Sequence, residues 1–124
     1  MKNLLAIAAA GEAVTGLILL VSPSIVVQLL FGAEIAGAGT VMSRIAGISL
    51  IALGMACWPR SERGRPDKES TRAASSAMLS YSLLATLYLG YVGAVREWVG
   101  ILLWPAVGVH AVVTVLLARA WFKE

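Results

Sequence analysis

The chain has 124 residues, of which 59% are hydrophobic and 14% are charged, and its formal net charge is +3. A soluble domain carries about a quarter charged residues, and a short chain has a large surface relative to its volume. The composition therefore excludes an ordinary soluble domain and predicts an integral membrane protein. The basic residues occupy chain ends and loops instead of one concentrated face, which argues against binding of nucleic acid.

The first predicted element is a membrane-spanning helix over residues 3–21, an apolar run long enough to cross a bilayer. Its one ionisable side chain is Glu12, near the middle. A carboxylate at that depth is costly in lipid, so we expect it to face protein or water and to mark a site. Alanine and glycine share its helix face, which favours a close helix–helix contact there. A cleaved signal peptide is the alternative, but the apolar pattern continues to Val21.

A short piece and a connection separate this helix from the second predicted span, residues 40–58. Pro23 interrupts the first helix, because proline lacks a backbone donor. The piece that follows, 25–31, is either a bent continuation of that helix or an amphipathic helix at the membrane interface. In the second span, Gly47 and Gly54 lie on a stripe of small residues. We therefore expect both glycines to face another helix instead of lipid.

The second half of the chain begins with a hydrophilic segment, residues 60–72, which we expect to be a solvated loop. Two further spans are predicted over 73–93 and 99–121, with a tight turn between them. Backbone polar groups in lipid must be hydrogen-bonded internally, so all four spans should be helices. The predicted fold is all-α: one transmembrane domain, an integral membrane antiparallel four-helix bundle.

The distribution of lysine and arginine predicts the orientation of this domain. With four spans, both termini and the segment 60–72 lie on one side of the membrane. That side holds eight of the 10 basic residues, all except Arg44 and Arg96. The positive-inside rule then places the segment and both termini in the cytoplasm. We expect a multi-pass protein of the cell (inner) membrane, in contact with the lipid bilayer.

Counting residues along each helix predicts one polar layer near mid-membrane. At a rise of about 1.5 Å per residue, five polar side chains fall at similar depth in the four spans. These residues, together with Arg44, form the predicted ligand or proton site: Glu12, Ser49, Tyr81, Ser82 and His110. Arg44 either extends to the headgroups or reaches toward the carboxylate. The alternative for the glutamate and the histidine is a structural pair that fixes helix order.

No motif indicates catalysis. The sequence contains no Gly-rich phosphate loop, nucleophile elbow or HExxH-type motif, so it predicts no catalytic residue and requires no cofactor. One histidine, one glutamate and the distant Cys57 do not build a metal site, so we also predict no bound metal.

Three segments carry a family resemblance: PSIVVQLLFG, SRIAGISLIALGMACW and WPAVGVHAVVTVLLARAW. Together they resemble the small four-helix bacterial membrane proteins grouped as DoxX-like. The matching positions are Pro23, Arg44, Gly47, Pro105 and His110. The resemblance covers most of the chain and implies a four-helix bundle. Some members of that group are associated with quinone-linked redox complexes.

A second stretch, AAAGEAVTG around Glu12, is similar to the first span of the small multidrug transporters, although the later spans depart from that family's glycine and aromatic pattern. The sequence thus leaves two hypotheses. The first is an accessory or small-ligand-binding membrane subunit, with a lipid or quinone-like molecule near the polar layer and a membrane protein partner or a homo-oligomer. The alternative is a proton-coupled small-molecule transporter that works through Glu12.

Overall fold

The computed structural model describes residues 2–62 and 65–123, and within those ranges the chain is helical apart from one short hairpin. The hairpin pairs β1 (Ser61–Glu62) with β2 (Arg65–Pro66) in antiparallel register. The helices, in chain order, are α1 (Lys2–Val21), α2 (Pro23–Phe31), α3 (Ala38–Cys57), α4 (Lys68–Val95) and α5 (Leu103–Lys123). Among the described residues, α1, α3, α4 and α5 are long and apolar enough to cross a membrane.

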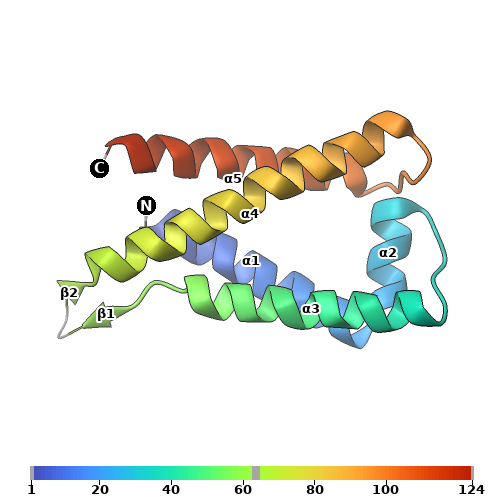
Figure 1. Cartoon of the computed structure of the whole chain (residues 1–124), viewed down its shortest axis with the longest axis horizontal. Helices are drawn as coiled ribbons and strands as arrows, with labels where there is room; N and C mark the ends of the chain where they lie inside the picture. The colour runs from blue at the N-terminus through green and yellow to red at the C-terminus, as the bar shows by residue number, and fades with distance from the viewer. Residues whose placement is uncertain (1, 63–64, 124) are drawn as a thin grey trace.

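The four long helices pack mainly as two pairs, α1 with α3 and α4 with α5 (Figure 1). In the first pair the two backbones touch directly. A Cβ placed on Gly47 would lie 2.6 Å from the carbonyl oxygen of Gly16, and one on Gly54 would lie 2.6 Å from that of Ala9. Real Cβ atoms do not approach that closely, so only glycine permits this contact. The expectation that Gly47 and Gly54 face another helix is confirmed.

The second pair meets through larger side chains. The Trp104 ring of α5 lies against Gly93 of α4, where an added Cβ would come within 2.7 Å of the ring. At the other end of the pair, the Arg72 guanidinium lies 4.4 Å from the ring centroid of Trp121, which is a cation–π contact. The two contacts fix α4 against α5 at both ends.

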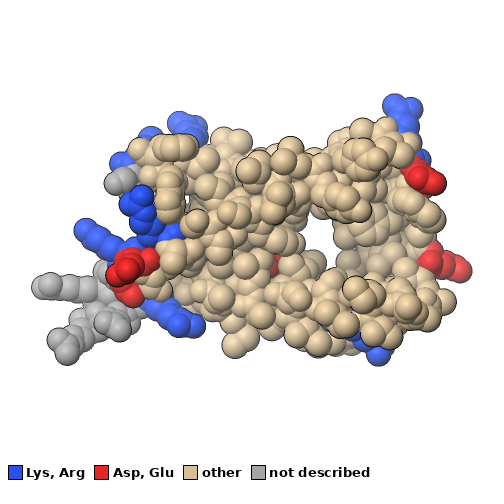
Figure 2. All heavy atoms as spheres, viewed as in Figure 1, with Lys and Arg blue, Asp and Glu red and all other residues tan. Residues whose placement is uncertain are grey.

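The packed core lies toward the end of the molecule that holds the chain termini and the hairpin (Figure 1). Each long helix contributes to it, and its largest members are Leu5, Cys57, Met78 and Leu117. Lys and Arg side chains gather at this same end in Figure 2. Both termini and the hairpin lie at this end (Figure 1). This is expected when a chain runs back and forth through four long helices.

At the opposite end, the short helix α2 crosses from the α1–α3 pair to the connection between α4 and α5 (Figure 1). Two backbone hydrogen bonds fasten it there: Gly100 N–H donates to the Leu30 carbonyl at 2.8 Å, and Leu102 N–H donates to the Leu29 carbonyl at 2.9 Å. These bonds satisfy carbonyls that a helix C-terminus otherwise leaves unpaired. Gly100 is needed for this contact, because a Cβ there would overlap the Leu29 carbonyl.

Several predicted boundaries differ from the structure, and the largest differences are at α4 and α5. Residues 60–72 are not a loop throughout, because α4 begins at Lys68 instead of residue 73. Its start is set by Asp67, whose carboxylate accepts hydrogen bonds from the backbone N–H groups of Glu69 and Ser70. At its other end, α4 runs to Val95 instead of residue 93.

The last helix also starts later than predicted. Residues 99–102 lie outside α5, which begins at Leu103 instead of residue 99. Their backbone groups bond to α2 instead of continuing a helix. The predicted piece 25–31 is present as α2, a separate helix that begins at Pro23, the residue type favoured in a first helical turn.

Candidate functional site

Glu12 is buried on α1, with 9% of its surface exposed. It follows Ala8 and Ala9, which pack in the core, and precedes Gly16, which touches α3. These small neighbours share its face of the helix, so α1 turns its carboxylate inward. The sequence predicted this orientation from the same alanines and glycines.

His110 on α5 and Tyr81 on α4 meet Glu12 in the interior. The Nδ1 atom of His110 lies 3.8 Å from Oε1 of Glu12, and both side chains are largely buried. The rings of Tyr81 and His110 pack edge to face, with centroids 5.7 Å apart and planes at 79°. The Tyr81 side chain also lies near the Glu12 carboxylate. We call Glu12, Tyr81 and His110 the polar triad.

Ser82 is also buried, but no recorded contact joins it to the polar triad. Its surface is 1% exposed, and among the described residues its hydroxyl has no hydrogen-bond partner. Other hydroxyls in these helices behave differently: those of Thr86 and Thr114 donate to carbonyls of their own helices, at 2.7 Å in each case. The Ser82 hydroxyl is thus a buried hydrogen-bond donor without an acceptor among the described residues.

The other two predicted site residues, Ser49 and Arg44, lie outside the triad. Ser49 is exposed on α3, and its hydroxyl donates to the Ile45 carbonyl at 3.0 Å. Arg44 is exposed as well, and no ion pair joins it to Glu12 within the described chain. The structure therefore brings neither residue to the triad, and their part in a ligand or proton site stays a prediction. Residue counting along a helix predicts depth but not rotation, and glycines, not Ser49, occupy the face of α3 that meets α1.

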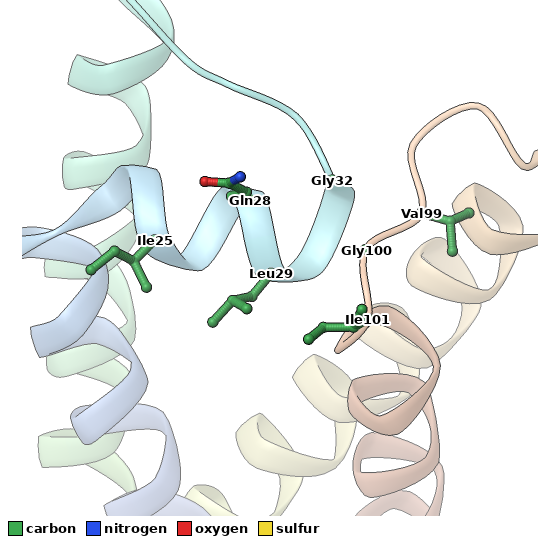
Figure 3. Close-up of a pocket in the computed structure, with 7 residues that line it drawn as sticks. All are labelled: Ile25, Gln28, Leu29, Gly32, Val99, Gly100 and Ile101. Atoms are coloured by element: carbon green, nitrogen blue, oxygen red, sulfur yellow. The ribbon is translucent and has the colours of Figure 1, made fainter.

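A hollow separates the two helix pairs between the core and α2 (Figure 2). Next to α2 the structure has a pocket of about 430 Å³, lined by α2 and by the segment that precedes α5. Figure 3 shows Ile25 and Leu29 projecting from α2, and Ile101 from the segment before α5, into the space between the helices, while Gln28, which also lines the pocket, lies on another side of α2. The sequence analysis did not single out this apolar wall. The available sequence signals were Pro23, where α2 begins, and Gly100, which lies in the non-helical segment before α5.

The triad offers a limited chemistry. It combines a carboxylate, a phenol and an imidazole, which together can donate and accept hydrogen bonds and can hold a proton. Across the described residues no group of three potential metal ligands occurs.

Comparison with protein-family models, with curated proteins and with solved structures finds nothing that matches this chain.

Proposed function

We propose that the chain is an integral membrane protein, inserted as an antiparallel four-helix bundle, that binds a small lipid or quinone-like molecule at the polar triad. The observation that carries this proposal is the meeting of Glu12, Tyr81 and His110 from three different helices in the interior. A buried carboxylate among membrane-spanning helices is expensive to maintain, which favours a functional role. A ligand's polar group can bond there to a donor and an acceptor at once.

The location that we propose follows the distribution of charge. Both termini and the hairpin share one end of the molecule, and the basic side chains gather there. We assign this end to the cytoplasmic face of a bacterial inner membrane, because cytoplasmic segments are enriched in lysine and arginine. The resemblance to DoxX-like proteins supports the same assignment and an accessory role beside a membrane protein partner or a second copy of the chain.

The test is mass spectrometry of molecules that co-purify with the intact protein. The wild type should retain a specific lipid or quinone-like molecule. Glu12→Gln should lower the retained amount about tenfold, the change that about 1.4 kcal/mol of binding free energy produces. Ser49→Ala is the matched control, because Ser49 is exposed and bonds only within its own helix. Equal retention by all three proteins would contradict the proposal.

One observation favours a second candidate, a proton-coupled small-molecule transporter. The carboxylate of Glu12 and the imidazole of His110 lie 3.8 Å apart, and both can take up and release a proton. In reconstituted vesicles, such a transporter would move protons when small organic cations are supplied. Glu12→Gln would abolish that movement. If the wild type moves no protons under these conditions, this second function is excluded for those substrates.

A further inference from the structure

We propose that the pocket beside α2 holds the apolar body of a membrane-dissolved amphiphile, which enters sideways from the lipid. This inference rests on the proposed function, because it concerns the remainder of the molecule whose polar group lies at the triad. It assigns a ligand class and a route: a molecule with one polar group and an extended apolar part, delivered through the bilayer and not from water.

Helix α2 creates the space. It has 9 residues, which at about 1.5 Å per residue give it a length of roughly 14 Å. It lies across the gap between the two helix pairs and is bonded to the α4–α5 connection through Gly100 and Leu102. At the other end of the molecule the same pairs meet through the core residues Leu5, Met78 and Leu117. The pairs are therefore in contact at one end and held apart at the other, and the space between them is a wedge.

The walls of the wide end are apolar and uncovered. Ile25 is 55% exposed and Ile101 is 77% exposed, although Figure 3 shows both projecting into the space between the helices, beside Leu29. An apolar cavity gains little from water and binds apolar molecules instead. The pocket volume of about 430 Å³ falls within the range of about 300–1,000 Å³ that is usual for small-molecule sites.

The position of α2 determines the route. The helix closes the end of the wedge, and two of its exposed residues, Ser24 and Gln28, are polar. The core closes the opposite end. What remains open is the side, between α3 and α4, where Figure 2 shows the hollow. In a bilayer that side faces hydrocarbon, so the molecules that reach it are those dissolved in the membrane.

The test uses photolabelling of the full chain in phospholipid nanodiscs. The probe is hexadecan-1-ol with a photoreactive diazirine in the middle of its alkyl chain. Labels located by mass spectrometry should concentrate on residues 25–32 and 99–103. Leu29→Trp, which fills the pocket, should lower labelling there about tenfold, equivalent to about 1.4 kcal/mol of binding free energy. Ile101→Trp provides a second filled pocket, at an exposed residue outside any helix, should the first variant not fold.

The matched control is Ser24→Trp, which adds the same ring at an exposed position of α2 outside the pocket lining and should leave labelling unchanged. Labels spread evenly over the outer surfaces, or equal labelling of the wild type and both filled variants, would overturn the inference. The two proposals fail separately. If Glu12→Gln loses the co-purifying molecules but the filled variants are labelled as strongly as the wild type, only the proposal about the α2 pocket is contradicted. If Glu12→Gln retains as much of the co-purifying molecule as the wild type, the proposed function itself is contradicted.

Discussion

His110 and Glu12 approach each other across the interior, with 3.8 Å between Nδ1 and Oε1, and so link the first and last helices of the chain. This distance exceeds that of a direct hydrogen bond, so the two groups are close neighbours in the interior without such a bond. Tyr81 packs against the imidazole and lies near the carboxylate, which brings α4 into the same contact. Three of the four long helices therefore meet at one polar point.

The first prediction concerns this contact. Glu12→Gln and His110→Gln should each lower the stability of the protein by about 1–3 kcal/mol, because each leaves a buried partner unpaired. The double variant should lose less than the sum, with a coupling energy of about 0.5–3 kcal/mol. Thermal unfolding in detergent measures all three losses. Glu34→Gln combined with His110→Gln is the control and should be additive, since Glu34 is exposed in the connection before α3. Additive losses for the Glu12 pair would show that the two groups do not interact.

The second prediction tests the backbone contact between α1 and α3. Gly47→Leu should lower the unfolding temperature sharply, because a side chain there meets the backbone of α1. Overpacking of this kind costs about 1–3 kcal/mol or more. Gly11→Leu is the control on α1, because nothing lies within 4 Å of the added Cβ. An unchanged unfolding temperature for Gly47→Leu would mean that this stripe faces lipid.

The third prediction is the topology. Glu69 is exposed near the start of α4. In the variant Glu69→Cys, the new cysteine should not be labelled when a membrane-impermeant maleimide is added to intact cells. Cysteines at Glu34 or Glu97, exposed at the opposite end, should react. The native Cys57 is buried, so the parent protein provides a low background. Labelling of the Glu69 variant from outside would reverse the orientation that we propose.

The fourth prediction concerns the attachment of α2. Gly100→Ala should weaken the contact with the Leu29 carbonyl and the two backbone hydrogen bonds, each worth about 1 kcal/mol. Hydrogen exchange at the Leu102 amide should then become faster. Gly108→Ala on α5 should not alter it, since its added Cβ meets nothing within 4 Å. Unaltered exchange in the Gly100 variant would show that α2 is held by other contacts.

The elements of the fold were largely predictable, because long apolar runs and prolines define where membrane helices begin and end. The pairing of α1 with α3 was accessible as well, since Gly47 and Gly54 had no other evident use. The start of α4 was missed for a local reason. Charged residues after Asp67 resemble a loop in composition, yet the aspartate caps a helix whose first turn is exposed.

The site was predictable only in part. Residue counting gives depth, and it correctly brought Glu12, Tyr81 and His110 together. It does not give the rotation of α3, on which Ser49 and Arg44 are exposed and lie outside the triad. The wedge depends on how far α2 holds the two pairs apart, and on hydrogen bonds between residues distant in sequence. No pattern within one segment contains that information, so the pocket emerged only from the three-dimensional structure.

The wedge has a consequence for selectivity. A space closed at one end and spread at the other admits molecules according to their cross-section more than their length. In the binding mode that we propose, a slender chain would advance toward the polar triad, whereas a bulky ring system would stop near α2. Because α2 sets the wider end, each residue added to or removed from it changes the spread by roughly 1.5 Å. Related chains with a longer or shorter α2 would accordingly discriminate among membrane-dissolved molecules by girth.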